Sequence, residues 1–121
     1  MSTIKVDNLQ TTGGAGRYTI HAWVCFTGSG TVSIRNSENI SSLTDSGTGM
    51  YFINYSNSFS NTNYAGSGAV RYDTTSNNRE NTFVNFRRIS DSISTTKAGL
   101  STSNSAASED DETVTFMVTG E

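Results

Sequence analysis

The stretch HAWVCFTGSGTVSIR, residues 21–35, decides the fold class that the sequence predicts. Side chains of a β-strand point alternately to its two faces. In an extended strand, one face would carry the side chains of Ala22, Val24 and Phe26. The opposite face would carry those of His21, Trp23 and Cys25. The Gly-Ser-Gly run at 28–30 then supplies turn chemistry. After it, Val32 and Ile34 again alternate with polar residues, which is the half-buried pattern. The stretch therefore predicts a β-hairpin.

Composition excludes several classes of protein. The chain has 121 residues, which suits one domain with a modest core. Hydrophobic residues make up 33% and charged residues 16%, with a formal net charge of −3 and a mean hydropathy of −0.43. Ser, Thr and Asn together supply roughly two-fifths of the chain, well above typical usage. The low charge argues against charge-driven disorder, and the mild acidity gives no basic surface for nucleic acid. No apolar run approaches the ~18 residues of a membrane helix.

Alternating segments continue the β pattern along the chain. Further expected strands are residues 39–45, 50–56, the vicinity of Gly68–Tyr72, 82–90 and 112–120, whereas residues 97–112 are expected to form a polar loop. No segment keeps a 3.6-residue apolar period over three turns, so very little helix is expected. The pattern predicts an all-β fold, an antiparallel β-sandwich or jelly-roll-like domain of about six to eight strands. Its few apolar residues favour additional burial between copies of the chain.

The first residues differ from the rest of the chain. Residues 1–19 are polar, with Ile4, Val6 and Leu9 as their only aliphatic side chains before a Gly-rich end. We expect a polar N-terminal arm that docks on another chain, followed by a β-sandwich domain over residues 20–121; a loosely ordered terminus is the alternative. The opening decapeptide lacks the apolar core of a secretory signal.

The row of His21, Trp23 and Cys25 raises the question of a reactive site. With a strand rise of ~3.3 Å per residue, His21 and Cys25 lie roughly 13 Å apart along the backbone. A Cys–His dyad needs hydrogen-bonding reach, and the chain has no second histidine. The acidic run 109–112 lacks the spacing of a known calcium loop and suits a solvated loop. We therefore expect no catalytic, metal-binding or cofactor-binding residue, and no enzyme.

Tyrosines are the remaining candidate contact residues. Four of them are candidates for stacking on a host-surface glycan or for contacting a partner: Tyr51, Tyr55, Tyr64 and Tyr72. Tyrosine is also a common structural residue at strand edges and interfaces. A carbohydrate-binding module is therefore one hypothesis for the function, beside the two virion roles described below.

A resemblance covers roughly the first half of the chain. Residues 21–65 resemble a module of tailed-bacteriophage virion proteins, whose pattern reads approximately AWV-F-G-GTV-IR-S-N-SS-TD-GTG-Y and ends in N-YA. The matching positions are Ala-Trp-Val at 22–24, Phe26, Gly28, Gly-Thr-Val at 30–32, Ile-Arg at 34–35, Ser37, Asn39, Ser41, Ser42, Thr44, Asp45, Gly-Thr-Gly at 47–49, Tyr51 and Asn-Tyr-Ala at 63–65. Where that family often has Asn, this chain has Cys25, and the pattern holds no known catalytic residue.

The resemblance implies a function class. It implies a non-enzymatic virion structural protein, exposed on the phage particle, tail-fibre-like, homotrimeric and assembled in the host cytoplasm. Host-surface binding would then be a natural role. The alternative is a capsid decoration or cement protein that clamps capsomers, with residues 1–19 docking on other virion proteins. No nucleic-acid or membrane partner is expected.

Overall fold

The computed structural model describes residues 2–3, 5, 12–13, 22–71, 83–87, 92–103 and 112–120. These residues form eight strands: β1 (Ala22–Thr27), β2 (Ser33–Glu38), β3 (Ile40–Gly47), β4 (Met50–Tyr55), β5 (Ala65–Arg71), β6 (Phe83–Phe86), β7 (Lys97–Ser103) and β8 (Thr113–Thr119). The described part of the chain contains no helix. The predicted all-β fold is confirmed, while most of the predicted arm over residues 1–19 lies outside the described residues.

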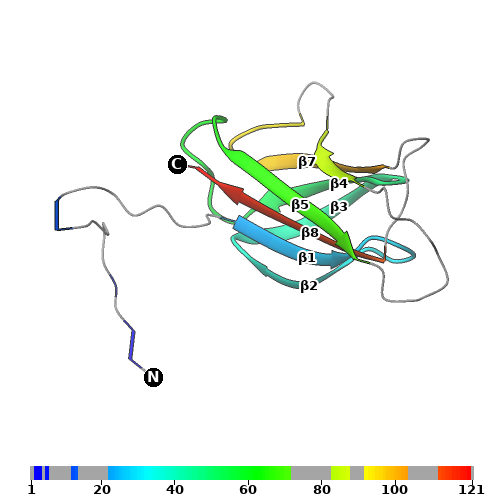
Figure 1. The fold of residues 1–121 in the computed structure, drawn as a ribbon, viewed down its shortest axis with the longest axis horizontal. Coiled ribbons are helices and arrows are strands. Elements are labelled where there is room, and N and C mark those ends of the chain that lie inside the picture. Colours follow the sequence, from blue (N-terminus) through cyan, green and yellow to red (C-terminus); the bar gives the residue numbers. More distant parts are fainter. Residues whose placement is uncertain are drawn as a thin grey trace.

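Two four-stranded antiparallel sheets pack face to face as a β-sandwich (Figure 1). The first sheet has the order β2-β1-β8-β5, and the second has the order β3-β4-β7-β6. The first and last strands of the domain therefore pair in the middle of one sheet, with β5 beside them. This arrangement brings together three segments that are far apart in the sequence.

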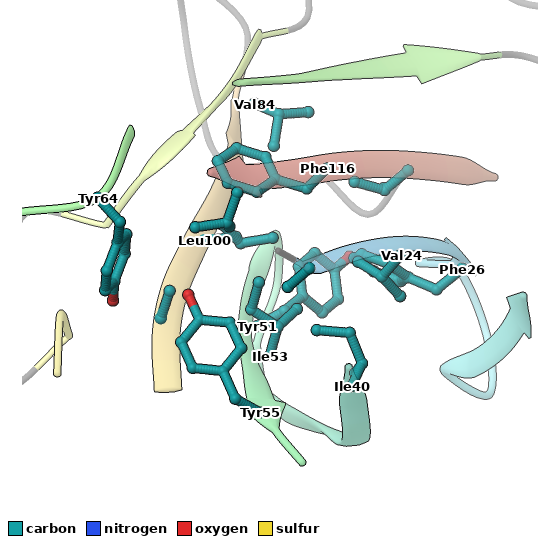
Figure 2. Close-up of a cluster of buried hydrophobic side chains, with 14 of the residues drawn as sticks. Val24, Phe26, Ile40, Tyr51, Ile53, Tyr55, Tyr64, Val84, Leu100 and Phe116 are labelled. Atoms are coloured by element: carbon teal, nitrogen blue, oxygen red, sulfur yellow. The ribbon is translucent and has the colours of Figure 1, made fainter. Parts of the chain in front are cut away.

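The core lies between the sheets. The buried hydrophobic side chains are Ala22, Val24, Phe26, Ile40, Tyr51, Ile53, Tyr55, Phe59, Tyr64, Val84, Ala98, Leu100, Val114, Phe116 and Val118. Figure 2 shows the side chains of β1 and β8 facing those of β4 and β7. The alternating buried residues of β1, β4 and β8 therefore face the space between the two sheets.

Strand β7 was not predicted. Residues 97–112 were expected to form a polar loop, and this prediction is wrong over Lys97–Ser103, a central strand of the second sheet. Its buried positions carry mostly small or polar residues, namely Ala98, Gly99 and Thr102, so only Leu100 gives a strong apolar signal. A Cβ added at Gly99 would lie 2.9 Å from the Ser92 Cβ and 3.2 Å from the Phe52 ring, so a larger side chain would need its neighbours to move.

Strand β2 pairs with β1 as predicted, but it is more exposed than the half-buried pattern implied. It forms the edge of its sheet, and Ile34 is 37% exposed. A bulge shifts the register, because Cys25 pairs with Asn36 whereas Phe26 pairs with Ile34. The bulge and the edge position together keep Ile34 out of the centre of the core.

Asn39 connects the two sheets between β2 and β3. It has a positive φ of 55°, a conformation that Asn tolerates better than most residues. Its side-chain amide donates to the Asn57 carbonyl at 3.2 Å, and its Oδ1 accepts from the Asn57 N–H at 2.7 Å. Asn39 therefore sets the backbone direction and fastens it to the segment that follows β4.

Replacing Asn39 with alanine should lower the free energy of unfolding by about 1–3 kcal/mol, because it adds left-handed backbone strain and removes both side-chain hydrogen bonds. Asn39→Gly keeps the backbone conformation and loses only the hydrogen bonds, so its loss should be smaller. Urea denaturation of the two variants at equal protein concentration checks this. A wild-type midpoint for Asn39→Ala would contradict the role given to this residue.

Candidate functional site

Three of the four tyrosines predicted to contact a glycan or a partner lie in the core. Tyr51 is 0%, Tyr55 7% and Tyr64 9% exposed, while Tyr72 lies outside the described residues. Their rings pack against other rings: Tyr51 lies 5.0 Å from Phe26 and Tyr55 lies 5.9 Å from Tyr64, measured between centroids. A sugar could stack on these three rings only after the core had opened, so they belong to the scaffold.

Two of these tyrosines also bind the backbone. The Tyr51 hydroxyl donates to the carbonyl of Gly28 at 2.8 Å, which ties the turn after β1 to the opposite sheet. The Tyr64 hydroxyl donates to the carbonyls of Ser94 at 2.8 Å and Lys97 at 3.2 Å. Both tyrosines therefore position loops at the ends of the sandwich.

The Tyr55 hydroxyl is in a less favourable environment. It is buried without a hydrogen-bond partner of good geometry among the described residues. Burial raises the pKa of Tyr55 well above its usual value near 10, and the neighbouring Tyr64 hydroxyl raises it further. As the pH rises above about 10, the unfolded chain loses this proton before the folded chain does, so stability falls with increasing pH.

Changing Tyr55 to phenylalanine should leave the free energy of unfolding at pH 7 unchanged or raise it by up to about 1 kcal/mol, because an unsatisfied buried hydroxyl disappears. The variant should also lose less stability than wild type between pH 9 and about 11, where the unfolded tyrosine ionises. Guanidinium titrations across this range measure both effects. Equal alkaline losses in the two proteins would mean that Tyr55 does not control the pH dependence.

The predicted row of His21, Trp23 and Cys25 is only partly described. His21 lies outside the described residues, whereas Trp23 and Cys25 point to the outer face of the first sheet and are half-buried. The described residues hold no cluster of three or more His, Cys, Asp or Glu side chains that could bind a metal ion. No helix among them could cross a membrane. The row instead borders an open groove.

This groove has a volume of about 500 Å³. Its outward-pointing side chains come from β1, β5 and β8, which lie side by side in Figure 1: Trp23, Cys25, Ser67, Ala69, Thr115 and Met117. We call this surface the outer groove. Small side chains form most of it, while Trp23 and the 49% exposed Met117 are its large apolar groups.

The strand register arranges the outer groove in two rows across the sheet. In one row, Trp23 pairs with Met117, which also pairs with Ser67. In the next row, Cys25 pairs with Thr115, which also pairs with Ala69. A second hollow of about 160 Å³ shares Ser67 and Met117 with the groove and reaches Ala65 and Thr119. The two hollows are therefore adjacent, and the smaller one reaches the end of the sheet where β1 begins.

Two polar groups along the outer groove bond within the chain. The Trp23 indole N–H donates to a Glu38 carboxylate oxygen at 3.2 Å, which orients the ring. The Thr115 hydroxyl donates to the Ala69 carbonyl at 3.2 Å. With these donors already engaged, the groove presents mainly apolar surface and few directed hydrogen bonds to a ligand.

The outer face of the second sheet is different. Its half-buried Phe52 ring has the Lys97 ammonium 4.6 Å and the Arg87 guanidinium 5.5 Å from its centroid. Arg87 also donates to the Ser46 hydroxyl at 3.1 Å. Cation–π contacts of this kind place charged groups over the half-buried ring. The second sheet therefore has charged groups around Phe52, and its most exposed apolar side chain among the described residues is Phe83 on the edge strand β6, which is 57% exposed.

Sequence reasoning missed the outer groove as a site. It considered Trp23 and Cys25 only as members of a possible reactive row, and it treated residues 112–120 only as an expected strand. The sheet order places β8 between β1 and β5, and only this order brings Met117, Ser67 and Ala69 next to Trp23 and Cys25. The available signal was the outward set of each strand, which combines small residues with Trp and Met.

Comparison with known proteins gives no match: neither the family models, nor the curated proteins, nor the solved structures contain one similar to this chain.

Proposed function

We propose that this chain is a non-enzymatic structural protein of a tailed-bacteriophage particle, exposed on the virion, tail-fibre-like and homotrimeric. The observation that carries the proposal is the phage-module pattern over residues 21–65, a stretch that spans β1 to β4 and continues to the start of β5. Several of its positions, such as Val24, Phe26 and Tyr51, are core residues. The pattern therefore includes residues that build the scaffold. We place the assembly of the particle in the host cytoplasm.

The outer groove supports an assembly role. Met117 is 49% exposed beside Trp23 on a domain with only 33% hydrophobic residues. Trp23 and Met117 thus give this polar domain a partly exposed apolar surface that association would remove from water. Covering it in an oligomer would add to a small core.

A capsid decoration or cement protein is the second candidate, in which residues 1–19 dock on other virion proteins. A carbohydrate-binding module is the third candidate, and it loses support because Tyr51, Tyr55 and Tyr64 are buried. A host glycan would then have to use other groups, of which half-buried Trp23 is the aromatic one in the outer groove.

Particle composition and labelling test these functions. Mass spectrometry of purified particles of the encoding phage should detect the chain, and immunogold labelling should place it at the tail. Labelling of the head would favour decoration over a tail-fibre-like role. Absence of the chain from purified particles would contradict both virion functions.

A further inference from the structure

We propose that the outer groove receives the N-terminal segment of a second copy of this chain, with Ile4 and Val6 as the side chains that enter it. The proposal rests on the proposed structural function, because it supplies the contact by which copies assemble. It gives residues 1–19 a specific partner, namely the outer face of β1, β8 and β5 in a neighbouring copy.

The chemistry of the groove favours an apolar protein segment over a glycan. Small side chains such as Cys25 and Ala69 permit close approach, and Trp23 and Met117 offer apolar contact. The Trp23 N–H and the Thr115 hydroxyl already donate within the chain. A sugar needs several directed hydrogen bonds, whereas aliphatic side chains are stabilised by burial alone.

The leader has residues that suit this surface. Ile4 and Val6 stand two positions apart, so an extended segment places both side chains on one face, roughly 7 Å apart. The two groove rows begin at Trp23 and Cys25, which are also two residues apart on one strand. Lys5 lies between the two aliphatic residues and would point to solvent. The spacing of the leader therefore matches the spacing of the rows.

Position and length indicate how the leader reaches a groove. The smaller hollow beside the outer groove reaches Ala65 and Thr119, at the end of the sheet where β1 starts at Ala22. The 21 residues before Ala22 can span up to roughly 70 Å when extended, which exceeds the size of a small domain. The described leader residues are all exposed in the single chain: Ser2, Thr3, Lys5, Thr12 and Gly13. Docking in a neighbouring copy agrees with this exposure.

Such a contact uses different surfaces on the two copies. A leader in one copy and a groove in the next make a heterologous interface, which closes into a ring when the rotation between copies allows it. In a ring of three copies, each groove would be occupied by the leader of a neighbouring copy. This closure agrees with the proposed homotrimer.

The chain's single cysteine makes a direct test practical. Cys25 lines the outer groove, so a thiol introduced by Ile4→Cys or Val6→Cys in the full chain should form a disulfide with it under mild oxidation. Each disulfide joins two thiols as they lose two electrons and two protons to the added oxidant. We expect chains linked in covalent oligomers, with peptide mass spectrometry identifying the bond to Cys25. Lys5→Cys, which would face solvent, is the matched control, and adding Cys25→Ser should abolish the bond.

Each outcome of this experiment has a meaning. A bond within one chain would place the leader in its own groove and overturn the proposal. Absence of a bond to Cys25 from both variants would also overturn it. If the full chain still sedimented as an oligomer in that case, the proposed assembly role would stand and only the leader–groove contact would fail.

A charge in the groove should weaken the same contact. Met117→Glu in the full chain should raise the dissociation constant of the oligomer by about tenfold or more, because association would have to bury a carboxylate in an apolar contact. Phe83→Glu is the control, since Phe83 is 57% exposed on β6 of the other sheet. Sedimentation at several concentrations measures both variants, and circular dichroism confirms their folding. Equal dissociation constants for the folded variants would contradict the proposed contact.

Discussion

Replacing Tyr51 with alanine should lower the free energy of unfolding by about 3–5 kcal/mol, the range for truncating a large buried aromatic side chain. Tyr51 is 0% exposed on β4, and its ring makes an edge contact with Phe26 across the two sheets. Its hydroxyl donates to Gly28, so truncation also leaves a carbonyl without this donor. Such a loss is a large fraction of the stability of a small domain. Urea denaturation followed by circular dichroism measures it.

Two matched variants separate the contributions of Tyr51. Tyr51→Phe keeps the ring and loses the hydrogen bond, so its cost should be about 1–3 kcal/mol. Phe83→Ala truncates an aromatic ring that is 57% exposed and should change stability by less than about 1 kcal/mol. All variants must be compared at one protein concentration, because association would stabilise the folded state. A loss for Tyr51→Ala as small as that for Phe83→Ala would contradict the core placement of Tyr51.

Replacing Gly68 with alanine should have the second large effect. An added Cβ would lie 2.5 Å from the Thr115 carbonyl oxygen, and it would also collide with the Phe116 ring. Because the carbonyl belongs to the central strand β8, it cannot move without disturbing the sheet. We expect a loss of about 1–3 kcal/mol or more from overpacking. Thermal and urea unfolding of the purified variant measure this loss.

Ser67→Ala is the control for Gly68→Ala on the same strand. Ser67 is exposed, so this change should alter the free energy of unfolding by less than about 0.5 kcal/mol. A Gly68→Ala variant as stable as Ser67→Ala would show that β5 does not pair with β8 in the register described. That register also builds the outer groove, so the comparison bears on the site as well as the fold.

Strands with strict alternation of apolar residues could be predicted from the sequence. Val24 and Phe26 share one face of β1 as their spacing indicated, and the structure buries that face. Val114, Phe116 and Val118 alternate in the same way on β8 and are also buried. The Gly-rich turns also follow from local chemistry, since Gly30 has a positive φ of 64°. These features depend only on residues close together in the chain.

Features that depend on long-range packing could not be predicted in the same way. Strand β7 is central in its sheet but contains small residues such as Ala98 and Gly99, which give a weak strand signal. Their burial depends on the neighbouring strands. Tyr64 was a candidate contact residue because its burial is not visible in the sequence. It packs against Phe59 and Phe86, which come next to it only in the folded sandwich. The outer groove needs the order β1-β8-β5, which alternation within single strands does not specify.

Sedimentation equilibrium of the purified full chain tests most directly the central claim that this protein is an assembling structural subunit. The chain mass is 13.0 kDa, and the measurement should cover a wide range of protein concentrations. We predict a species of three times the chain mass that persists on dilution. A single species of 13.0 kDa at every concentration would contradict the claim.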